Sequence, residues 1–388
     1  MATKVCFDIS TLSSGSRHRG IGMYALTLAK AFAKIQPRPA DLEIYLALGR
    51  GLALRVVPLP DDPAWIEAEA LRGKPVPYTV YYATKQTVAL ARLMAEGVDL
   101  VHAAEPKGAC FPPRCRTIVT CHDIIPAVLG PPYRSRFTPA WVSAAVATAR
   151  YRLPDHVIAI SAYTRSDLER VTGISRDRVS VVHHGVDASV FHLDKGPHEA
   201  ARIRAIAGER PYFLYVGGFD ERKQVPELIA AFARAARDLD HALVIAGRIG
   251  RNERAPIERA VAAAGAKERV VLAGFVSAED LPALYRGATA HVMPSTYEGF
   301  GMTVLEAFAC GCPVIAARTS SVPEIAGDAA LFVPPGDTDA LSEAIGRVAL
   351  EESLRRSLTE RGLARAAQFT WERCAAETLD VYRSVLGR

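Results

Sequence analysis

Two carboxylates flank a glycine-rich turn in the segment 297–307, which reads YEGFGMTVLEA. The pattern predicts the start of a helix, and the first turn of a helix leaves its N–H groups unpaired. We therefore expect the N–H groups of residues 300–303 to point toward an anion or a hydroxyl-rich ligand. Glu298 or Glu306 alone could be a helix-dipole partner or a solvated side chain. Together they indicate a site, because Glu306 lies among apolar neighbours, where a charged group needs a partner.

A second cluster, 217–224, follows a strand pattern and reads GGFDERKQ. Glycines after a strand, such as Gly218, allow the backbone to approach a ligand closely. Arg222 and Lys223 offer a planar fork and a point charge, a combination that suits a diphosphate. An isolated Arg-Lys pair is commonly a solvated turn, but its position at the end of this strand favours ligand binding.

Two further clusters lie in the first half of the chain. The loop RHRGIGMY at 17–24 places Gly20 and Gly22 at a helix start, where the backbone could approach a phosphate or an acceptor. It lacks the third glycine of the dinucleotide fingerprint, and no acidic residue ends a strand about 20 residues later, so NAD binding is not supported. His122 and Asp123 follow the strand pattern at 116–121. His122 is either catalytic or structural. The expected role of the neighbouring Asp123 is to fix the tautomer of the His122 ring and nothing more.

Short β-branched runs alternate with longer amphipathic stretches, which is the rhythm of parallel α/β sheets. In the first half, the predicted strands are 4–9, 42–47, 98–102, 116–121, 156–160 and 178–182, and the predicted helices are 20–35, 79–95, 137–152 and 161–172. In the second half, the predicted strands are 212–217, 242–247, 269–273, 289–293, 313–317 and 329–333, with helices such as 225–237 and 302–311. The fold class is therefore α/β, with two doubly wound, Rossmann-like sheets and a ligand cleft between them.

Length and composition agree with two domains. The 388 residues exceed the roughly 250 to 300 at which one core stops growing. The net charge of +5 is spread without a dense basic run, which does not favour nucleic-acid binding. The seven cysteines are odd in number and several lie inside apolar runs, so they are interpreted as reduced and buried. Their spacing does not fit zinc knuckles. No signal-peptide pattern and no run of about 20 apolar residues occurs, so we expect a cytoplasmic protein.

At these residues the sequence resembles the retaining glycosyltransferases of family GT4, which have the GT-B fold. The similarity covers nearly the whole chain and is carried by Gly20-Ile21-Gly22, His122-Asp123, 160–165, 184–187, 218–223, Glu298 with Glu306, and 311–316. The resemblance implies an acceptor-binding domain at 1–190 and a nucleotide-sugar-binding domain at 191–369. It also implies that the helix at 370–388 packs back on the first domain.

Carried over residue by residue, the resemblance implies that Arg222 and Lys223 bind the donor diphosphate. Glu306 would bind the ribose hydroxyls, and Glu298 the hydroxyls of the transferred sugar. Backbone amides for the sugar and phosphate would come from Phe300, Gly301 and Met302.

In the first domain, the resemblance implies that Gly22 faces the diphosphate and that His122 lies beside the reacting face of the sugar. Gln224 and His184 stand where many relatives have asparagine. Neither departure removes a charge that the diphosphate needs, but both bear on donor-base specificity and local turn geometry.

The resemblance implies a metal-independent reaction with retention, in which the acceptor hydroxyl enters beside the departing phosphate. No metal site is expected, because the Asp-x-Asp motif at 337–339 precedes a helix and is interpreted as its N-cap. No cofactor is required beyond the nucleotide-sugar donor. A retaining glycosidase would instead use paired carboxylates, one of them as nucleophile. Glu298 suits that role poorly if it binds hydroxyls remote from the reacting carbon.

The sequence favours GDP-mannose as donor, on the resemblance of 122–126 and 222–223 to bacterial mannosyltransferases, with UDP-sugars as the alternative. The expected acceptor is a surface glycan or a lipid-linked sugar. The stretch 133–152 mixes basic and aromatic residues and could rest on the inner face of the plasma membrane, or could be an ordinary amphipathic helix. A nucleotide-sugar epimerase and a non-catalytic nucleotide-sugar-binding protein are the competing classes.

Overall fold

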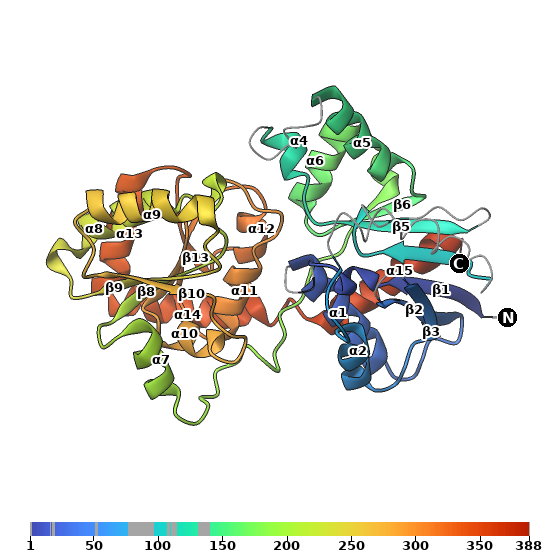
Figure 1. The fold of residues 1–388 in the computed structure, drawn as a ribbon, viewed down its shortest axis with the longest axis horizontal. Coiled ribbons are helices and arrows are strands. Elements are labelled where there is room, and N and C mark those ends of the chain that lie inside the picture. Colours follow the sequence, from blue (N-terminus) through green and yellow to red (C-terminus); the bar gives the residue numbers. More distant parts are fainter. Residues whose placement is uncertain are drawn as a thin grey trace. The chain divides into compact units, whose positions relative to one another are not determined.

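The structure is a computed structural model, which describes residues 2–15, 17, 20–50, 53–76, 97–106, 109, 115–130 and 140–387. The chain divides into two compact units (Figure 1). The first consists of Met1–Gly185 with Trp371–Arg388, and the second of Val186–Thr370. Each unit has its own sheet and its own apolar core.

The sheet of the first unit has the strand order β3-β2-β1-β4-β5-β6-β7 among the described residues. Its strands are β1 (Thr3–Asp8), β2 (Leu42–Arg50), β3 (Ala53–Pro58), β4 (Leu100–Ala103), β5 (Arg116–Cys121), β6 (His156–Ala159) and β7 (Val179–Val181). All pairs are parallel except β2 with β3. The strands predicted in the first half of the chain are confirmed as the parallel strands of this sheet. The edge strand β3 is absent from the prediction, because it lacks the continuous apolar run of a strand buried on both faces.

Helices pack on both faces of this sheet. They are α1 (Gly20–Lys34), α2 (Pro63–Ala70), α4 (Ile125–Val128), α5 (Ala140–Arg152), α6 (Ala162–Thr172) and α15 (Trp371–Leu386), with short 3-10 turns at Ser10–Ser13 and Arg176–Arg178. The helix predicted at 79–95 lies outside the described residues. Helix α15 packs against α1, and Tyr382 of α15 is fully buried in the same core as Phe7 and Phe32. A distant part of the sequence thus completes this core.

The second unit has an all-parallel sheet of order β10-β9-β8-β11-β12-β13. Its strands are β8 (Tyr212–Val216), β9 (Ala242–Ala246), β10 (Val270–Gly274), β11 (Ala290–Met293), β12 (Val314–Ala317) and β13 (Ala330–Val333). Its helices are α7 (Glu199–Ala207), α8 (Val225–Ala235), α9 (Arg251–Ala263), α10 (Leu281–Gly287), α11 (Met302–Ala309), α12 (Val322–Ala326), α13 (Thr338–Leu350) and α14 (Glu352–Ala366). Helices α8, α9 and α13 cover one face, and α7, α10, α11 and α14 the other (Figure 1). The predicted α/β class with two doubly wound sheets is confirmed.

The strand orders place a topological switch point in each sheet. In the first unit the order reverses between β1 and β4, and in the second between β8 and β11. Ligands of open α/β sheets bind outside the carboxyl ends of the strands at such points. The loop that follows β8 carries Arg222 and Lys223, and the loop that follows β11 carries Glu298, whereas Glu306 lies in α11.

Candidate functional site

Arg222, Lys223 and Glu298 form one ionic cluster at the switch point of the second unit. Arg222 and Lys223 lie in the 3-10 turn Glu221–Lys223 that follows β8, and Glu298 lies in the loop between β11 and α11. Arg222 Nη1 is 3.0 Å from Glu298 Oε2, and Lys223 Nζ is 2.6 Å from Glu298 Oε1. The sequence places these residues about 75 positions apart, and the adjacency of β8 and β11 brings them together.

Backbone hydrogen bonds join the two loops of this ionic cluster. Arg222 Nη1 also donates to the Tyr297 carbonyl at 2.7 Å, and the Thr296 N–H donates to the Arg222 carbonyl at 2.8 Å. Ser320 Oγ accepts from the Glu298 N–H at 2.8 Å. The cluster is therefore fixed by main-chain contacts as well as by charge.

The charges of the cluster are only slightly exposed to solvent. The side chains of Arg222, Lys223 and Glu298 are 14%, 15% and 12% exposed. Burial alone would raise the pKa of Glu298, but Lys223 and Arg222 outweigh it, and the pKa lies below its ordinary value. Glu298 is thus ionised at neutral pH and acts as the counter-ion of both cations.

Glu306 lies within α11 and bonds to a different partner. The hydroxyl of Tyr285, from α10, donates to Glu306 Oε2 at 3.0 Å. Burial raises the pKa of Glu306 to about 7, and the hydrogen bond from Tyr285 opposes that rise. This carboxylate therefore titrates near neutral pH, and Tyr285 is the partner that the apolar sequence context of Glu306 required.

The glycine-rich turn is shaped for the start of α11. Gly301 has φ of +126°, a conformation that L side chains rarely adopt, and it is the N-cap of α11. The N–H groups of Val304 and Leu305 donate to the Gly301 carbonyl, so Met302 and Thr303 form the first turn, whose N–H groups have no intrahelical acceptor. The ring of Phe300 is buried, edge-to-face with Phe369. Phe300 can therefore contribute to a ligand through its backbone only.

The loops after β8 and β9 approach each other closely. A Cβ added at Gly247 would lie 2.0 Å from the Gly217 carbonyl oxygen, so only glycine fits there. The hydroxyl of Tyr215 donates to the Gly218 carbonyl at 2.5 Å, which holds the β8 loop in place. Gly218 thus lies in a fixed turn directly before the two cations.

An exposed aromatic ring lies at the same edge of the sheet and was not identified from the sequence. Phe275 follows β10 and is 67% exposed, and the Arg248 guanidinium, after β9, lies 5.5 Å from its ring centroid. The signal that could have found them is positional, because each residue directly follows a glycine at the end of a strand pattern. A flat exposed ring beside a cation can stack on a heteroaromatic base.

In the first unit, His122 lies in the loop after β5 and is held as a neutral ring. His122 Nε2 is 2.8 Å from the Ala104 carbonyl, which requires the proton on Nε2 and leaves Nδ1 as an acceptor. Burial lowers the pKa of His122 to about 4. The expectation that Asp123 fixes the tautomer is wrong, because Ala104 does so, whereas Asp123 Oδ1 accepts from the Ile125 N–H at 3.1 Å.

His122 also contacts the helix that carries the predicted glycines. Its ring is edge-to-face with Tyr24 of α1, with centroids 4.9 Å apart, and Tyr24 stacks on His184 at 4.7 Å. Gly20 and Gly22 form the first turn of α1, and Gly20 is exposed whereas Gly22 is buried. The preceding positions 18–19 lie outside the described residues. The first-unit candidates thus meet around the start of α1.

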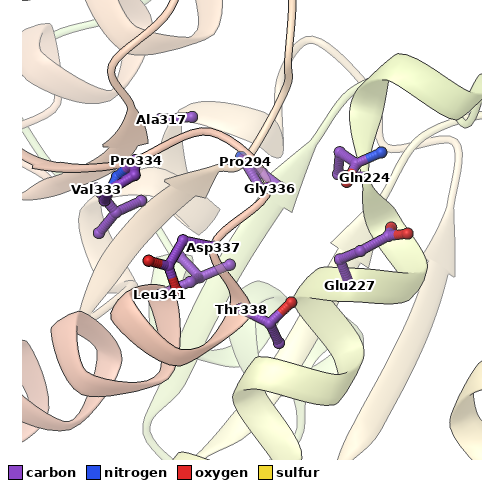
Figure 2. A pocket seen from close by; sticks show the side chains of 10 residues that line it. All are labelled: Gln224, Glu227, Pro294, Ala317, Val333, Pro334, Gly336, Asp337, Thr338 and Leu341. Atoms are coloured by element: carbon purple, nitrogen blue, oxygen red, sulfur yellow. The ribbon is translucent and has the colours of Figure 1, made fainter.

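A separate shallow pocket opens where β11, β12 and β13 end, beside the first turns of α8 and α13 (Figure 2). Two of its lining residues are acidic, Glu227 and Asp337. Asp337 accepts from the N–H groups of Asp339 and Ala340, which confirms its predicted role as the N-cap of α13. The space inside the pocket that the centre of a water-sized molecule can reach is only about 10 Å³, against the roughly 300 to 1,000 Å³ of small-molecule sites, and the ionic cluster does not line it, so we assign it no ligand.

Membrane spans and metal sites are both absent from the part of the chain that the structure describes. No helix in the described ranges combines the length and apolarity needed to cross a membrane. Within the same ranges, no group of three or more His, Cys, Asp or Glu side chains is arranged to hold a metal ion.

Two family profiles match the chain. The profile described as "Glycosyltransferase Family 4" matches residues 18–190, and the one described as "Glycosyl transferases group 1" matches residues 198–365. Among curated proteins, the chain is similar to the O-antigen chain mannosyltransferase B of Escherichia coli, with 32% identity over 232 residues. The match covers 58% of this chain and 60% of that protein, so the chain spans less than two thirds of that relative.

Solved structures resemble the whole chain. Sucrose-phosphate synthase of Thermosynechococcus elongatus superimposes with a TM-score of 0.77 and 24% identity, covering 99% of each chain. The Anabaena protein Alr3699/HepE, solved in complex with UDP and glucose, gives a TM-score of 0.75 with 19% identity and covers 98% of this chain and 100% of that one. At these identities the likeness shows the fold alone, which is GT-B.

Proposed function

This chain belongs to the group 1 glycosyltransferases of family GT4, and from that premise we propose that it is a retaining hexosyltransferase that uses a nucleotide diphosphate sugar. The observation that carries the proposal is the ionic cluster of Arg222, Lys223 and Glu298 at the switch point between β8 and β11. A fork, a point charge and a carboxylate at this position match a ligand that combines phosphates with sugar hydroxyls.

Each donor group is assigned to a part of the second unit. Arg222 and Lys223 bind the diphosphate, and the turn at Gly218 lets the backbone approach it. The N–H groups of residues 300–302, at the start of α11, bind phosphate and sugar. Glu298 binds hydroxyls of the transferred sugar, and Glu306 binds the ribose hydroxyls. The family resemblance supplies these roles, and the clustering of the charged side chains supports them.

The base is assigned to the exposed ring of Phe275. This ring and Arg248 follow β10 and β9, the strands next to β8, on which the diphosphate loop begins. A base stacked on Phe275 would be attached to a ribose and diphosphate that extend along the same sheet edge toward β8 and β11. The donor therefore runs along the carboxyl ends of adjacent strands, as in other open α/β sheets.

The reaction breaks the bond between the anomeric carbon and the diphosphate oxygen and forms a bond from that carbon to the acceptor oxygen. Negative charge develops on the departing diphosphate, and Arg222 and Lys223 stabilise it there. One well-placed donor of this kind lowers a barrier by about 3 kcal/mol. The acceptor enters on the face that the diphosphate leaves, which gives retention, and its proton passes to a diphosphate oxygen. The cations supply the charge that a metal ion provides in other transferases.

The first unit is assigned to the acceptor. By the family resemblance, His122, whose Nδ1 is left as an acceptor by the bond to Ala104, would act beside the reacting face of the sugar, and Gly20 and Gly22 would offer backbone to the diphosphate. The family pattern assigns acceptor binding to the domain at 1–190 and donor binding to the domain at 191–369. The proposed peripheral membrane contact through 133–152 falls partly on 131–139, which lie outside the described residues.

We propose GDP-mannose as the donor. As the acceptor we propose a growing surface glycan or a lipid-linked sugar that is extended in the cytoplasm. The similarity to the O-antigen chain mannosyltransferase B of Escherichia coli supports mannose. The likeness to the Anabaena protein solved with UDP and glucose keeps UDP-sugars as the alternative.

The test is thermal stabilisation of the purified protein by GDP, UDP, GDP-mannose, UDP-glucose and UDP-N-acetylglucosamine in the presence of EDTA. A ligand at 100 times its Kd stabilises the native state by about 2.7 kcal/mol, a shift that is easily measured. Stabilisation by guanine ligands alone supports GDP-mannose, and stabilisation by uridine ligands alone replaces that donor with a UDP-sugar. No shift with any ligand refutes nucleotide-sugar binding.

Turnover separates the transferase from its two competitors. Incubation with the donor and mannose-containing glycans should release free nucleotide in proportion to the glycan that is extended. An epimerase would change the sugar without releasing nucleotide, and a non-catalytic binding protein would do neither.

A further inference from the structure

Tyr285 contacts the proposed ribose-binding carboxylate from a neighbouring helix. Its hydroxyl donates to Glu306 Oε2 at 3.0 Å, whereas Glu306 Oε1 receives no hydrogen bond from the described residues. Tyr285 is fully buried, and Glu306 retains some solvent exposure. One oxygen of the carboxylate is thus occupied by the protein, and the other is left for a ligand.

The ring of Tyr285 is held rigidly in place. It is edge-to-face with His291 of β11, with centroids 5.5 Å apart and planes at 85°, and edge-to-face with Phe191 at 6.2 Å. Packing of α10 against α11 places the hydroxyl beside Glu306. A ring fixed on two sides can orient the carboxylate, whose own terminal torsion is otherwise broad.

We propose that Tyr285 is a positioning residue for nucleotide binding, which holds Glu306 Oε2 so that Oε1 receives the ribose hydroxyls of the donor. The proposal rests on the proposed function, because it takes the ligand of Glu306 to be a ribose. Tyr285 would not touch the donor itself. It acts through Glu306, and it keeps that carboxylate in the ionised, hydrogen-bond-accepting form.

Few titratable groups face Glu306, so the hydrogen bond from Tyr285 is the main contact that opposes the effect of burial on the pKa of Glu306. From α10 the facing group is Tyr285, from β11 it is His291 behind that ring, and from the end of α11 itself it is Cys310. No charged side chain of α12, α14 or β12 in the described ranges acts on Glu306. Burial raises the pKa of Glu306, and the hydroxyl of Tyr285 lowers it, so removal of the hydroxyl favours the protonated form.

The variant that tests the proposal is Tyr285→Phe, with Tyr212→Phe as the matched control. Tyr212 is similarly buried in the second unit, and its hydroxyl donates at 2.8 Å to the carbonyl of Leu284, the residue before Tyr285 on α10, so the control perturbs the same helix without removing the hydrogen bond to Glu306. Calorimetric titration of the whole chain with GDP and UDP, at pH 7.5, gives the affinity of whichever nucleotide binds. We expect Tyr285→Phe to weaken binding about fivefold to tenfold, and Tyr212→Phe to leave it within about twofold.

The 2′,3′-dideoxy forms of the same nucleotide provide the decisive comparison. They lack both hydroxyls, so wild type and Tyr285→Phe should bind them equally. Between about pH 6 and 8.5, binding of the normal nucleotide should weaken as the pH falls, and in Tyr285→Phe this weakening should begin at a higher pH. In turnover, KM for the donor should rise with kcat little changed, since a ribose contact is equally strong in ground and transition states.

Two outcomes would overturn the proposal while the proposed function stands. Wild-type nucleotide affinity in Tyr285→Phe would mean that the hydroxyl does not position Glu306. Equal weakening for the normal and dideoxy nucleotides would mean that the substitution only perturbs the packing of α10 on α11. If the wild-type protein binds neither GDP nor UDP, the proposed function itself fails.

Discussion

Replacement of Glu298 by glutamine would remove the carboxylate that Arg222 and Lys223 share while preserving the size of the side chain. The two ion pairs that disappear have N–O distances of 3.0 and 2.6 Å, between side chains that are 12–15% exposed. Removal of one partner of a buried ion pair costs about 3 to 5 kcal/mol, and the residual exposure favours the lower figure. For a domain of this size, about 3 kcal/mol corresponds to a fall in Tm of roughly 6 to 12 °C.

The same substitution should have opposite effects on nucleotide binding and on transfer. Without Glu298, the phosphates compete for the two cations with one carboxylate, Asp220 at 3.0 Å from Arg222 Nε, instead of two, so the bound nucleoside diphosphate should be held about fivefold more tightly. Transfer should nevertheless fall by roughly tenfold to 100-fold, because the proposed bonds to the sugar hydroxyls are lost. Differential scanning fluorimetry with and without nucleotide, together with kcat/KM, measures both effects.

Glu351→Gln is the matched control for this experiment. Glu351 pairs with Arg347 at the end of α13 on the open surface, where solvent screens the interaction, so Tm and nucleotide affinity should stay almost unchanged. If Glu298→Gln also kept the wild-type Tm and nucleotide affinity, the reasoning from the ionic cluster would be refuted.

Three further predictions concern other parts of the chain. Phe275→Ala should weaken nucleotide binding about tenfold by calorimetry, since base stacking contributes about 1 to 3 kcal/mol, whereas the similarly exposed control Leu350→Ala should have no effect. His122→Ala should lower kcat without changing donor affinity, and a parallel loss of affinity would contradict its assignment beside the reacting face. Burial lowers the pKa of His102 to about 3 and that of His122 to about 4, so the fold requires both rings to be neutral. The free energy of unfolding is therefore at its full value above about pH 6.5, the pKa of an unfolded histidine, and decreases as the pH falls below it. By about pH 5 these two histidines should cost the first unit about 4 kcal/mol, and His184, whose pKa burial also lowers, adds to the loss. In the second unit, burial lowers the pKa of His291 to about 4, but protonation of Glu306, whose pKa burial raises, offsets that loss, so hydrogen exchange should show the first unit opening first.

The parallel strands of both sheets could be predicted because each is an apolar run with its own local pattern. β3 could not be predicted, since an antiparallel edge strand has weaker patterning than a strand covered on both faces. The predicted helix at 302–311 is α11, and the glycine-rich turn before it has the positive φ at Gly301 that favours glycine.

The contacts within the site depend on strand order, which the local pattern does not contain. Sequence reasoning assigned Arg222 and Lys223 to the diphosphate and Glu298 to the sugar, yet in this structure the three contact one another because β8 and β11 are neighbours. Likewise, the need of Glu306 for a partner was predictable from its apolar context. That the partner is Tyr285 depends on how α10 packs against α11, and no spacing in the sequence encodes it.

The placement of α15 in the core of the first unit has a consequence for biosynthesis. The ribosome completes the second unit as one continuous segment, whereas the first unit waits for α15, which is made about 185 residues after Gly185 and, at about 5 to 20 residues per second, roughly 10 to 40 seconds later. During that interval, the surface of α1 that α15 will cover is open to solvent and to chaperones. The second unit can therefore mature first, although translation of the first unit began earlier.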